Sequence, residues 1–246
     1  MKMQNKKEKQ QQEREEHTQR IAESKNRRSG GLNLERQIPS LQEKLTLLIY
    51  CEGKNTEPSY FNQFKILTAS IKSFGEGRNT VSLVERAKQL ADEKEYDQVW
   101  CVFDADPKPD NPQQLSNFNE AVRLAESYNF GVAYSNQAFE YWLILHFEDH
   151  QGGSMDRTLY NDKINRYINP LGATYDVNGS KIISKNFFEL LFEIDETVKS
   201  TFPSTRTEIA IKRAKRIYES YDHSNPGREE SSTTVFSLVK ELIKFM

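Results

Sequence analysis

Two apolar stretches that end in acidic residues decide the fold of this chain. The first is LTLLIYCEG at residues 45–53, and the second is VWCVFDAD at residues 99–106. Each begins with a short uncharged run rich in leucine, β-branched or aromatic residues, which is typical of a strand buried on both faces of a parallel sheet. Sites in such sheets form outside the carboxyl ends of the strands. We therefore expect Glu52, Asp104 and Asp106 to meet at one edge of a sheet.

The segments around these runs alternate between strand and helix patterns. We expect strands at 45–51, 80–83, 97–103 and 130–134. We expect helices at 57–73, 83–95, 113–128 and 138–147. This order predicts right-handed crossovers and an α/β fold, with a mostly parallel central sheet flanked by helices.

Composition divides the chain into three parts. Residues 1–42 are polar and are expected to form a flexible or helical basic arm, since the first forty residues hold ten Lys or Arg against six Glu. Residues 43–150 carry the strand–helix alternation and form the predicted core. We expect 151–246 to be a mainly helical C-terminal part packed on that core. Its helical patterns lie near 155–168, 186–200, 206–222 and 233–245.

Charge and cysteine content narrow the class of protein. The net charge is -2, so the whole chain has no strong basic field of the kind that attracts nucleic acid. No apolar run approaches the roughly twenty residues of a membrane span, and no signal-peptide pattern occurs. Cys51 and Cys101 each fall within a predicted strand, as small core residues of a reducing compartment do. We expect a cytoplasmic protein without a membrane segment.

The acidic strand ends predict a divalent metal. Three carboxylates at one edge would repel one another, and Mg²⁺ or Mn²⁺ is the usual ion that oxygen ligands of this kind hold. Glu57 could join them as a ligand, or it could stabilise the start of a helix at Thr56-Glu57-Pro58. Glu140 lies among aromatic residues, where a carboxylate is costly unless it is paired, caps a helix or binds metal.

The motifs, taken in order, resemble those of RloB-like proteins. The matching stretches are CEGKNTEPSYF at 51–61, FDAD at 103–106 and SNQAFEYWLILHF at 135–147. RloB-like proteins are regarded as members of the TOPRIM superfamily. The resemblance therefore implies a TOPRIM-like core in which Glu52 is the first-strand acid and Asp104 and Asp106 are the Asp-x-Asp pair, together holding Mg²⁺.

The resemblance also implies a biological role. Family members tend to occur beside an ABC-type ATPase in phage-defence loci, which suggests an effector nuclease, or toxin, controlled by that partner. One departure from the family pattern lies near the C-terminus, where Asn225-Pro226 is separated from Ser232-Thr233 by an insertion.

A nuclease also needs cations beside its acids. One or two Mg²⁺ ions activate the attacking water and neutralise charge, with Glu52 acting as ligand or as general base. Lys54 follows the first strand, and Lys185 follows a possible extra strand at 182–183, as a lysine does in related nucleases; a solvated lysine is the alternative. The predicted helix at 206–222 presents a basic face that either is solvated or contacts DNA or RNA: Lys212, Arg213 and Arg216.

Two other functions stay open. A phosphatase resembling the haloacid dehalogenases also uses Asp-x-Asp, but its nucleophile follows the first strand, where this chain has Glu52. A non-catalytic module could instead bind an ATPase and sense nucleic acid. The sequence is compatible with a homodimer.

Overall fold

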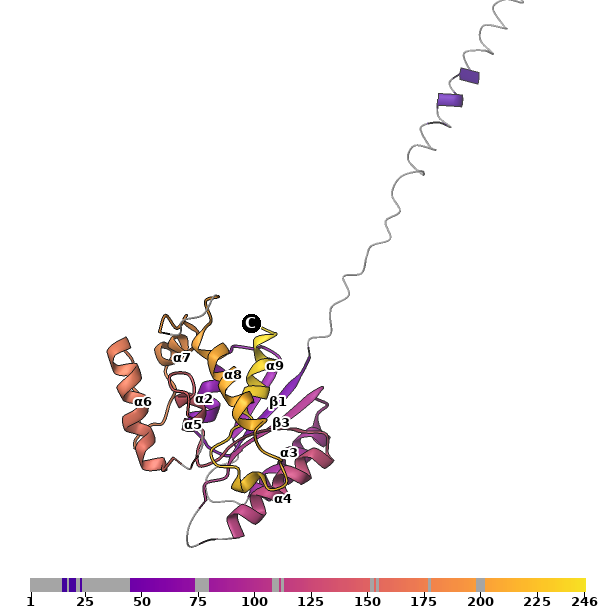
Figure 1. Ribbon diagram of the computed structural model, residues 1–246. Coiled ribbons are helices and arrows are strands. Elements are labelled where there is room, and N and C mark those ends of the chain that lie inside the picture. The colour runs from indigo at the N-terminus through magenta and orange to yellow at the C-terminus, as the bar shows by residue number, and fades with distance from the viewer. Residues whose placement is uncertain are drawn as a thin grey trace, which may run out of the picture. The chain divides into compact units, whose positions relative to one another are not determined.

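The structure is a computed structural model, and it describes most of the chain after Lys44 (Figure 1). The described residues are 15–16, 18–20, 23, 45–73, 80–107, 111, 113–150, 153, 155–176, 178–197 and 202–246. Leu45–Met246 forms one compact unit, and Met1–Lys44 forms another, of which the few described residues are helical. The predicted basic arm at 1–42 therefore lies almost wholly outside the described residues.

A parallel sheet forms the centre of the compact unit. Its strands, in spatial order, are β2 (Ala69–Ser73), β1 (Leu47–Cys51), β3 (Gln98–Asp104) and β4 (Gly131–Ser135). All three strand pairings are parallel, so the carboxyl ends of the strands share one edge. The sheet confirms the predicted α/β fold and is consistent with a TOPRIM-like core.

Side chains alternate between the two faces of the central strand β1. Leu48 and Tyr50 face a core formed with α3 (Thr80–Glu93) and α4 (Gln113–Ser127), which pack against each other on one side of the sheet. Leu47 and its alternate neighbours face the opposite core. Because both faces are covered, all five residues of β1 are buried.

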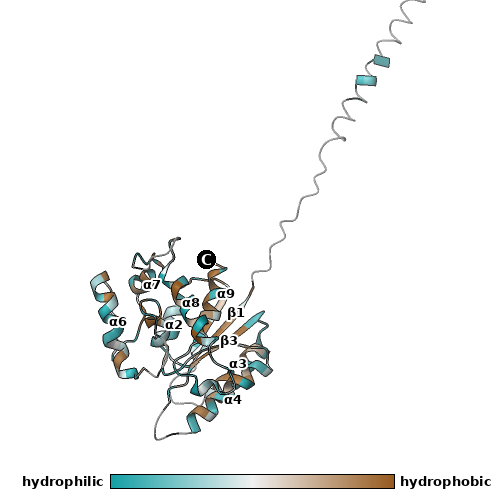
Figure 2. Ribbon diagram, in the orientation of Figure 1, coloured by the Kyte–Doolittle hydropathy of each residue, from teal (hydrophilic) through white to brown (hydrophobic). Residues whose placement is uncertain are grey.

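The second core joins the middle of the chain to its C-terminal part. It contains the fully buried Trp142 and side chains from helices on that face of the sheet. These helices are α2 (Thr56–Asn62), α5 (Glu140–Ile144), α6 (Tyr160–Ile168), α7 (Lys185–Phe192), α8 (Arg206–Tyr218) and α9 (Val235–Ile243). Figure 2 shows apolar residues on the strands and polar residues on the outward sides of the helices. The C-terminal helices thus complete the core of the α/β unit.

Two predicted elements between β1 and β3 are wrong. The helix expected over 57–73 ends at Asn62, because Lys65 turns the backbone into the left-handed region (φ 54°) and 69–73 instead pairs with β1 as β2. Leu67, which falls within the predicted helix, is 91% exposed. The strand expected at 80–83 is the first turn of α3, whose buried residues follow helical spacing: Thr80, Leu83, Val84, Ala87 and Leu90.

Two later predictions also need correction. Residues 182–183 form no strand; the Ile183 backbone N–H donates to Ser59 Oγ (2.8 Å), so this segment runs alongside α2 before α7 begins. The helix expected over 138–147 is shorter, because α5 ends at Ile144 and the chain continues in turns. Within the described residues, no helix has both the length and the apolar character needed to cross a membrane.

Candidate active site

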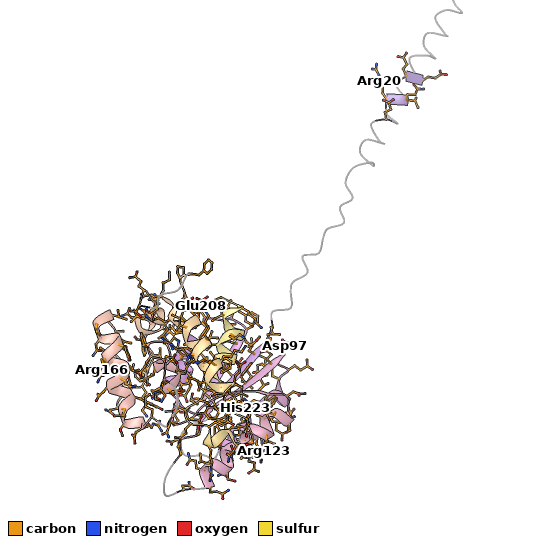
Figure 3. The ribbon with its side chains drawn as sticks, in the orientation of Figure 1. Arg20, Asp97, Arg123, Arg166, Glu208 and His223 are labelled. Carbon is orange, nitrogen blue, oxygen red and sulfur yellow. The ribbon has the colours of Figure 1, made fainter. Side chains whose placement is uncertain are left out.

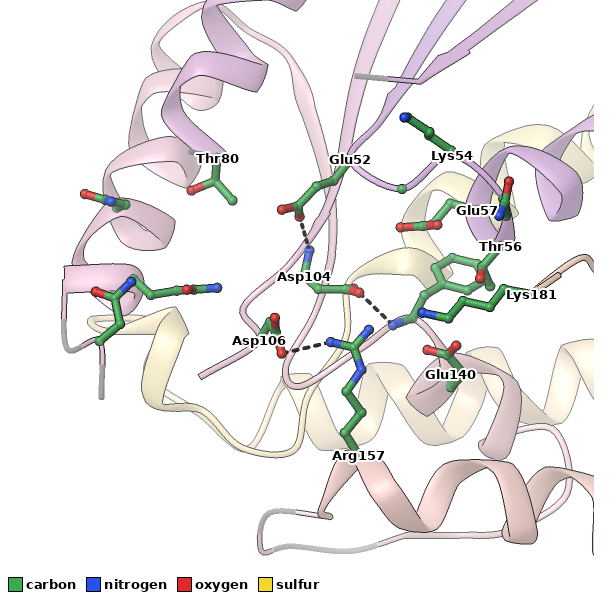
Figure 4. A pocket seen from close by; sticks show the side chains of 16 residues that line it. Glu52, Lys54, Thr56, Glu57, Thr80, Asp104, Asp106, Glu140, Arg157 and Lys181 are labelled. Carbon is green, nitrogen blue, oxygen red and sulfur yellow. Dashed lines mark hydrogen bonds and ion pairs between the residues drawn. The ribbon is translucent and has the colours of Figure 1, made fainter. Parts of the chain in front are cut away.

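A polar cleft of about 660 Å³ opens at the carboxyl edge of the sheet (Figure 4). The five carboxylates that line it are Glu52, Glu57, Asp104, Asp106 and Glu140. The cationic side chains that line it are Lys54, Arg157 and Lys181. The structure therefore brings together all five residues predicted to bind metal.

Glu52 and Asp104 are positioned by two adjacent strands. The parallel register pairs Cys51 with Val102, and the Glu52 backbone N–H continues this ladder by donating to the Val102 carbonyl (2.8 Å). Glu52 Oε2 in turn accepts the backbone N–H of Asp104 (3.2 Å). The first-strand acid thus reaches across to the end of β3, as neighbouring parallel strands allow.

Asp104 is a half-buried carboxylate among other carboxylates. Its Oδ2 accepts the backbone N–H of Phe139 (3.1 Å), just before α5. Burial raises its pKa well above the ordinary value, and the negative charges of Glu57, Glu52 and Glu140 raise it further. A positive ion in the cleft would relieve this repulsion.

Glu57 lies in the first turn of α2 and points into the cleft. Its side chain is buried, and burial raises its pKa to about 7, with repulsion from Glu140 and Glu52 contributing. Gly53 leaves room for it: a Cβ at this position would stand 2.3 Å from Glu57 Oε2. The glycine after the first-strand acid therefore permits a close approach of backbone and carboxylate.

Glu140 begins α5 and already has a partner. Its Oε1 accepts a hydrogen bond from the Tyr175 hydroxyl (2.8 Å), which also lies 3.1 Å from Thr56 Oγ1. Glu140 is only 4% exposed. The hydrogen bond offsets part of the cost of burial, so both interpretations from the sequence, structural and metal-binding, are compatible with its position.

Asp106 lies beyond the end of β3. The strand ends at Asp104, and the φ of Asp106 (38°) is left-handed, so the extended backbone does not continue through the Asp-x-Asp stretch. Its Oδ1 accepts from Arg157 Nη1 at 2.9 Å. Both aspartates still line the cleft.

Besides Lys54, the cleft contains Lys181, which lies four residues before the predicted Lys185. Lys185 lies on α7, pairs with Glu189 (3.4 Å) and is not among the lining residues. Lys181 follows a turn in which the Asp176 side chain accepts from two backbone N–H groups, and its own φ is 52°. In Figure 4 its ammonium group points between Glu57 and Glu140. The Asp-x-x-Gly turn at 176–179 was the available sequence signal.

The other predicted cations differ in their positions. Lys54 lines the cleft, but Figure 4 shows its side chain extending away from the two aspartates. On α8, Arg213 donates to the Leu145 carbonyl (2.8 Å) and Arg216 pairs with Asp149, which fastens this helix to the chain after α5. Lys212, Arg213 and Arg216 do not line the cleft.

The donor set fits a hard divalent cation, although the side chains do not yet surround one point. Among the described residues, no three His, Cys, Asp or Glu side chains form a group placed to hold a metal ion. The five carboxylates and three cations of the cleft leave a formal charge of -2, which one divalent ion would balance. An ion at a shared point would therefore need some of these carboxylates to turn; at present Asp104 accepts from the Phe139 N–H and Asp106 from Arg157.

The family model described as RloB-like protein matches residues 47–242. The chain belongs to the RloB-like family. In this RloB-like protein the match includes the four strands and all five cleft carboxylates. No curated protein and no solved structure matches the chain significantly.

The insertion near the C-terminus of this RloB-like protein is bridged by one buried side chain. Asn136 donates from Nδ2 to the Pro226 carbonyl (3.0 Å), and its Oδ1 accepts both the backbone N–H and the hydroxyl of Ser232 (3.0 and 2.7 Å). The two halves of the interrupted stretch therefore still meet, next to the end of β4.

Proposed function

We propose that this RloB-like protein is a Mg²⁺- or Mn²⁺-dependent nuclease of the TOPRIM type that cuts DNA or RNA. The observation that supports this most is the position of Glu52 and Asp104 at the ends of adjacent parallel strands, in one cleft with three further carboxylates. Carboxylates in such an arrangement suit metal-assisted phosphodiester hydrolysis. The nearby cations suit a negatively charged substrate.

The position of each cleft residue suggests its role in the proposed reaction. Glu52 and Asp104 are the expected principal ligands, with Asp106, Glu57 and Glu140 as further donors around the same cleft. A bound ion would supply an activated water and neutralise charge on the phosphate. Lys181 would stabilise negative charge from the side of Glu57 and Glu140, toward which it points.

A cleavage assay with paired variants tests the proposal. Pure protein would be incubated with DNA and tRNA pools in Mg²⁺, Mn²⁺ or EDTA, alongside Glu52→Gln and Asp104→Asn. We expect ion-dependent cleavage that falls about a hundredfold or more in each variant, and full activity in Lys185→Gln, whose side chain lies outside the cleft. Equal cleavage by wild type and both cleft variants would contradict the proposed site.

We further propose that an ABC-type ATPase controls the activity in an anti-phage defence system, an expectation that follows from the family resemblance. The test is cell survival when this chain is expressed with and without the product of the adjacent ATPase gene, before and after phage challenge. Toxicity should depend on Glu52 and on the partner. Identical survival of cells expressing wild type and Glu52→Gln under every condition would reject this role.

One observation favours a second candidate, a non-catalytic module that binds nucleic acid or a partner. Asp104 and Asp106 are engaged with Phe139 and Arg157, and no ready metal group exists among the described residues. Calorimetric titration with Mn²⁺ separates the candidates. Loss of Mn²⁺ binding in Asp104→Asn supports the nuclease. The same heat of titration in wild type and Asp104→Asn supports the non-catalytic module.

A further inference from the structure

Arg157 is a cleft residue that neither the strand pattern nor the family motifs indicated. It begins the short 3₁₀ segment η1 (Arg157–Leu159), across the cleft from α2. In Figure 4 its guanidinium rises toward Asp106, with Asp104 and Glu140 nearby. Its Nη1 donates to Asp106 Oδ1 at 2.9 Å.

The pair that Arg157 forms with Asp106 contributes little to folding. The two side chains are 44% and 28% exposed, and ion pairs of such exposure add little to stability. Asp106 has a left-handed backbone conformation (φ 38°), which Asp adopts more readily than most residues. A weak ion pair that lines a polar cleft can exchange its partners for a charged ligand.

The chemistry of the side chain identifies the ligand. A guanidinium carries five N–H donors in a planar fork that matches the oxygens of a phosphate, and the ion pair with Asp106 uses one of them. The positive charge lies within the field of Asp104, Asp106 and Glu140. A phosphate held at these carboxylates by an ion would therefore lie beside the guanidinium.

We propose that Arg157 binds the phosphodiester group of the substrate in the cleft, and that Asp106 holds the guanidinium in place until substrate or ion releases it. This inference deepens the proposed function and rests on it. Arg157 thereby supplies a phosphate contact in addition to Lys181, which enters the cleft from another segment of the chain.

Binding measured without cleavage tests the role of Arg157. Fluorescence anisotropy would follow labelled DNA and RNA oligonucleotides in Ca²⁺ at several salt concentrations, using Arg157→Gln, Arg157→Lys and the control Arg166→Gln. Arg166 lies on α6 (Figure 3) and is not among the residues that line the cleft, and its replacement by Gln removes the same charge. We expect Arg157→Gln to weaken oligonucleotide binding about tenfold. The slope of the logarithm of affinity against the logarithm of salt concentration should become shallower by about one. Arg157→Lys should have an intermediate affinity, and Arg166→Gln should bind almost as tightly as wild type.

The contact with Asp106 is tested in EDTA, where no ion contributes. Asp106→Asn should strengthen oligonucleotide binding several-fold by releasing the guanidinium, and adding Arg157→Gln should abolish that gain. Melting temperatures equal to wild type would show that the variants fold.

Each outcome has one meaning. The inference would be overturned if Arg157→Gln and Arg166→Gln bound the oligonucleotides equally well. It would also be overturned if the gain in affinity of Asp106→Asn persisted after Arg157 was replaced, or if the wild-type protein bound neither oligonucleotide. Binding that depends on Arg157 but comes with no cleavage in Mg²⁺ or Mn²⁺ would reject the nuclease and retain the phosphate site.

Discussion

The carboxylate of Asp104 accepts a hydrogen bond from the backbone N–H of Phe139, with 3.1 Å between Oδ2 and the nitrogen. This bond ties the end of β3 to the loop before α5, so that two motifs distant in the sequence meet at one side chain. Asp104 therefore has a structural partner as well as a proposed role as ligand. Substitutions at Asp104 can separate its structural role from its proposed role as a metal ligand.

We predict that Asp104→Asn and Asp104→Ala both lose cleavage but differ in stability. The amide oxygen of Asn can still accept the hydrogen bond from the Phe139 N–H, and the substitution removes a negative charge that repels the other carboxylates. In EDTA the free energy of unfolding of Asp104→Asn should therefore be at least that of wild type. Ala leaves the Phe139 N–H without this partner and should be about 1 kcal/mol less stable than Asn. Urea unfolding of the three proteins measures the difference. Retained cleavage in Asp104→Asn would count against ligation by this residue.

Gly53→Ala should act through Glu57. A Cβ would stand 2.3 Å from Glu57 Oε2, so the carboxylate must move out of its present place. If Glu57 contributes to ion binding, calorimetry should show Mn²⁺ affinity reduced by about tenfold, which corresponds to about 1.4 kcal/mol. In a Glu57→Gln background the same substitution should change the affinity little. An equal loss in both backgrounds would mean that Gly53 acts by another route.

His146 should make the protein sensitive to acid. It is fully buried, its Nδ1 lies 3.0 Å from the Trp142 carbonyl, and burial lowers its pKa to about 3. The unfolded chain binds a proton below about pH 6.5 and the folded chain does not, so stability present above pH 6.5 is lost as the pH falls toward 3. This group alone contributes a slope of up to about 1.4 kcal/mol per pH unit.

Urea unfolding between pH 7.5 and 5 checks the prediction for His146. His146→Leu should flatten the pH dependence relative to wild type, because the unfolded variant has no imidazole at this position to protonate. The same slope in His146→Leu and wild type would show that this histidine is not the source of the acid sensitivity.

Asn136→Ala should destabilise the fold by about 2–4 kcal/mol. The side chain is fully buried and makes hydrogen bonds to Pro226 and Ser232, whose groups would be left unsatisfied. Thermal or urea unfolding would measure the loss, with the exposed Asn62→Ala as a control expected to change little. A similarly small effect at both positions would mean that the C-terminal stretch is held by its other contacts.

The strand ends were predictable because they depend on local pattern. Buried parallel strands read as apolar runs, and Glu52 and Asp104 each follow such a run directly. The edge strand β2 gave no such signal: its residues are half-buried or exposed, and an apolar helical pattern covered part of it. Pairing with β1 decided its structure, which local propensity cannot reveal.

The sequence by itself determined the parallel α/β core, the family and the meeting of Glu52, Asp104 and Asp106 at one edge, because acidic residues at strand ends follow from local order along the chain. Only the tertiary structure decided which cations complete the cleft. Lys181 and Arg157 reach it from segments far along the chain. Lys181 precedes a stretch that hydrogen-bonds to α2 through Ile183 and Ser59, and Arg157 begins a 3₁₀ segment that packs against α6. Long-range packing places these two cations in the cleft, and the local sequence pattern does not predict such packing.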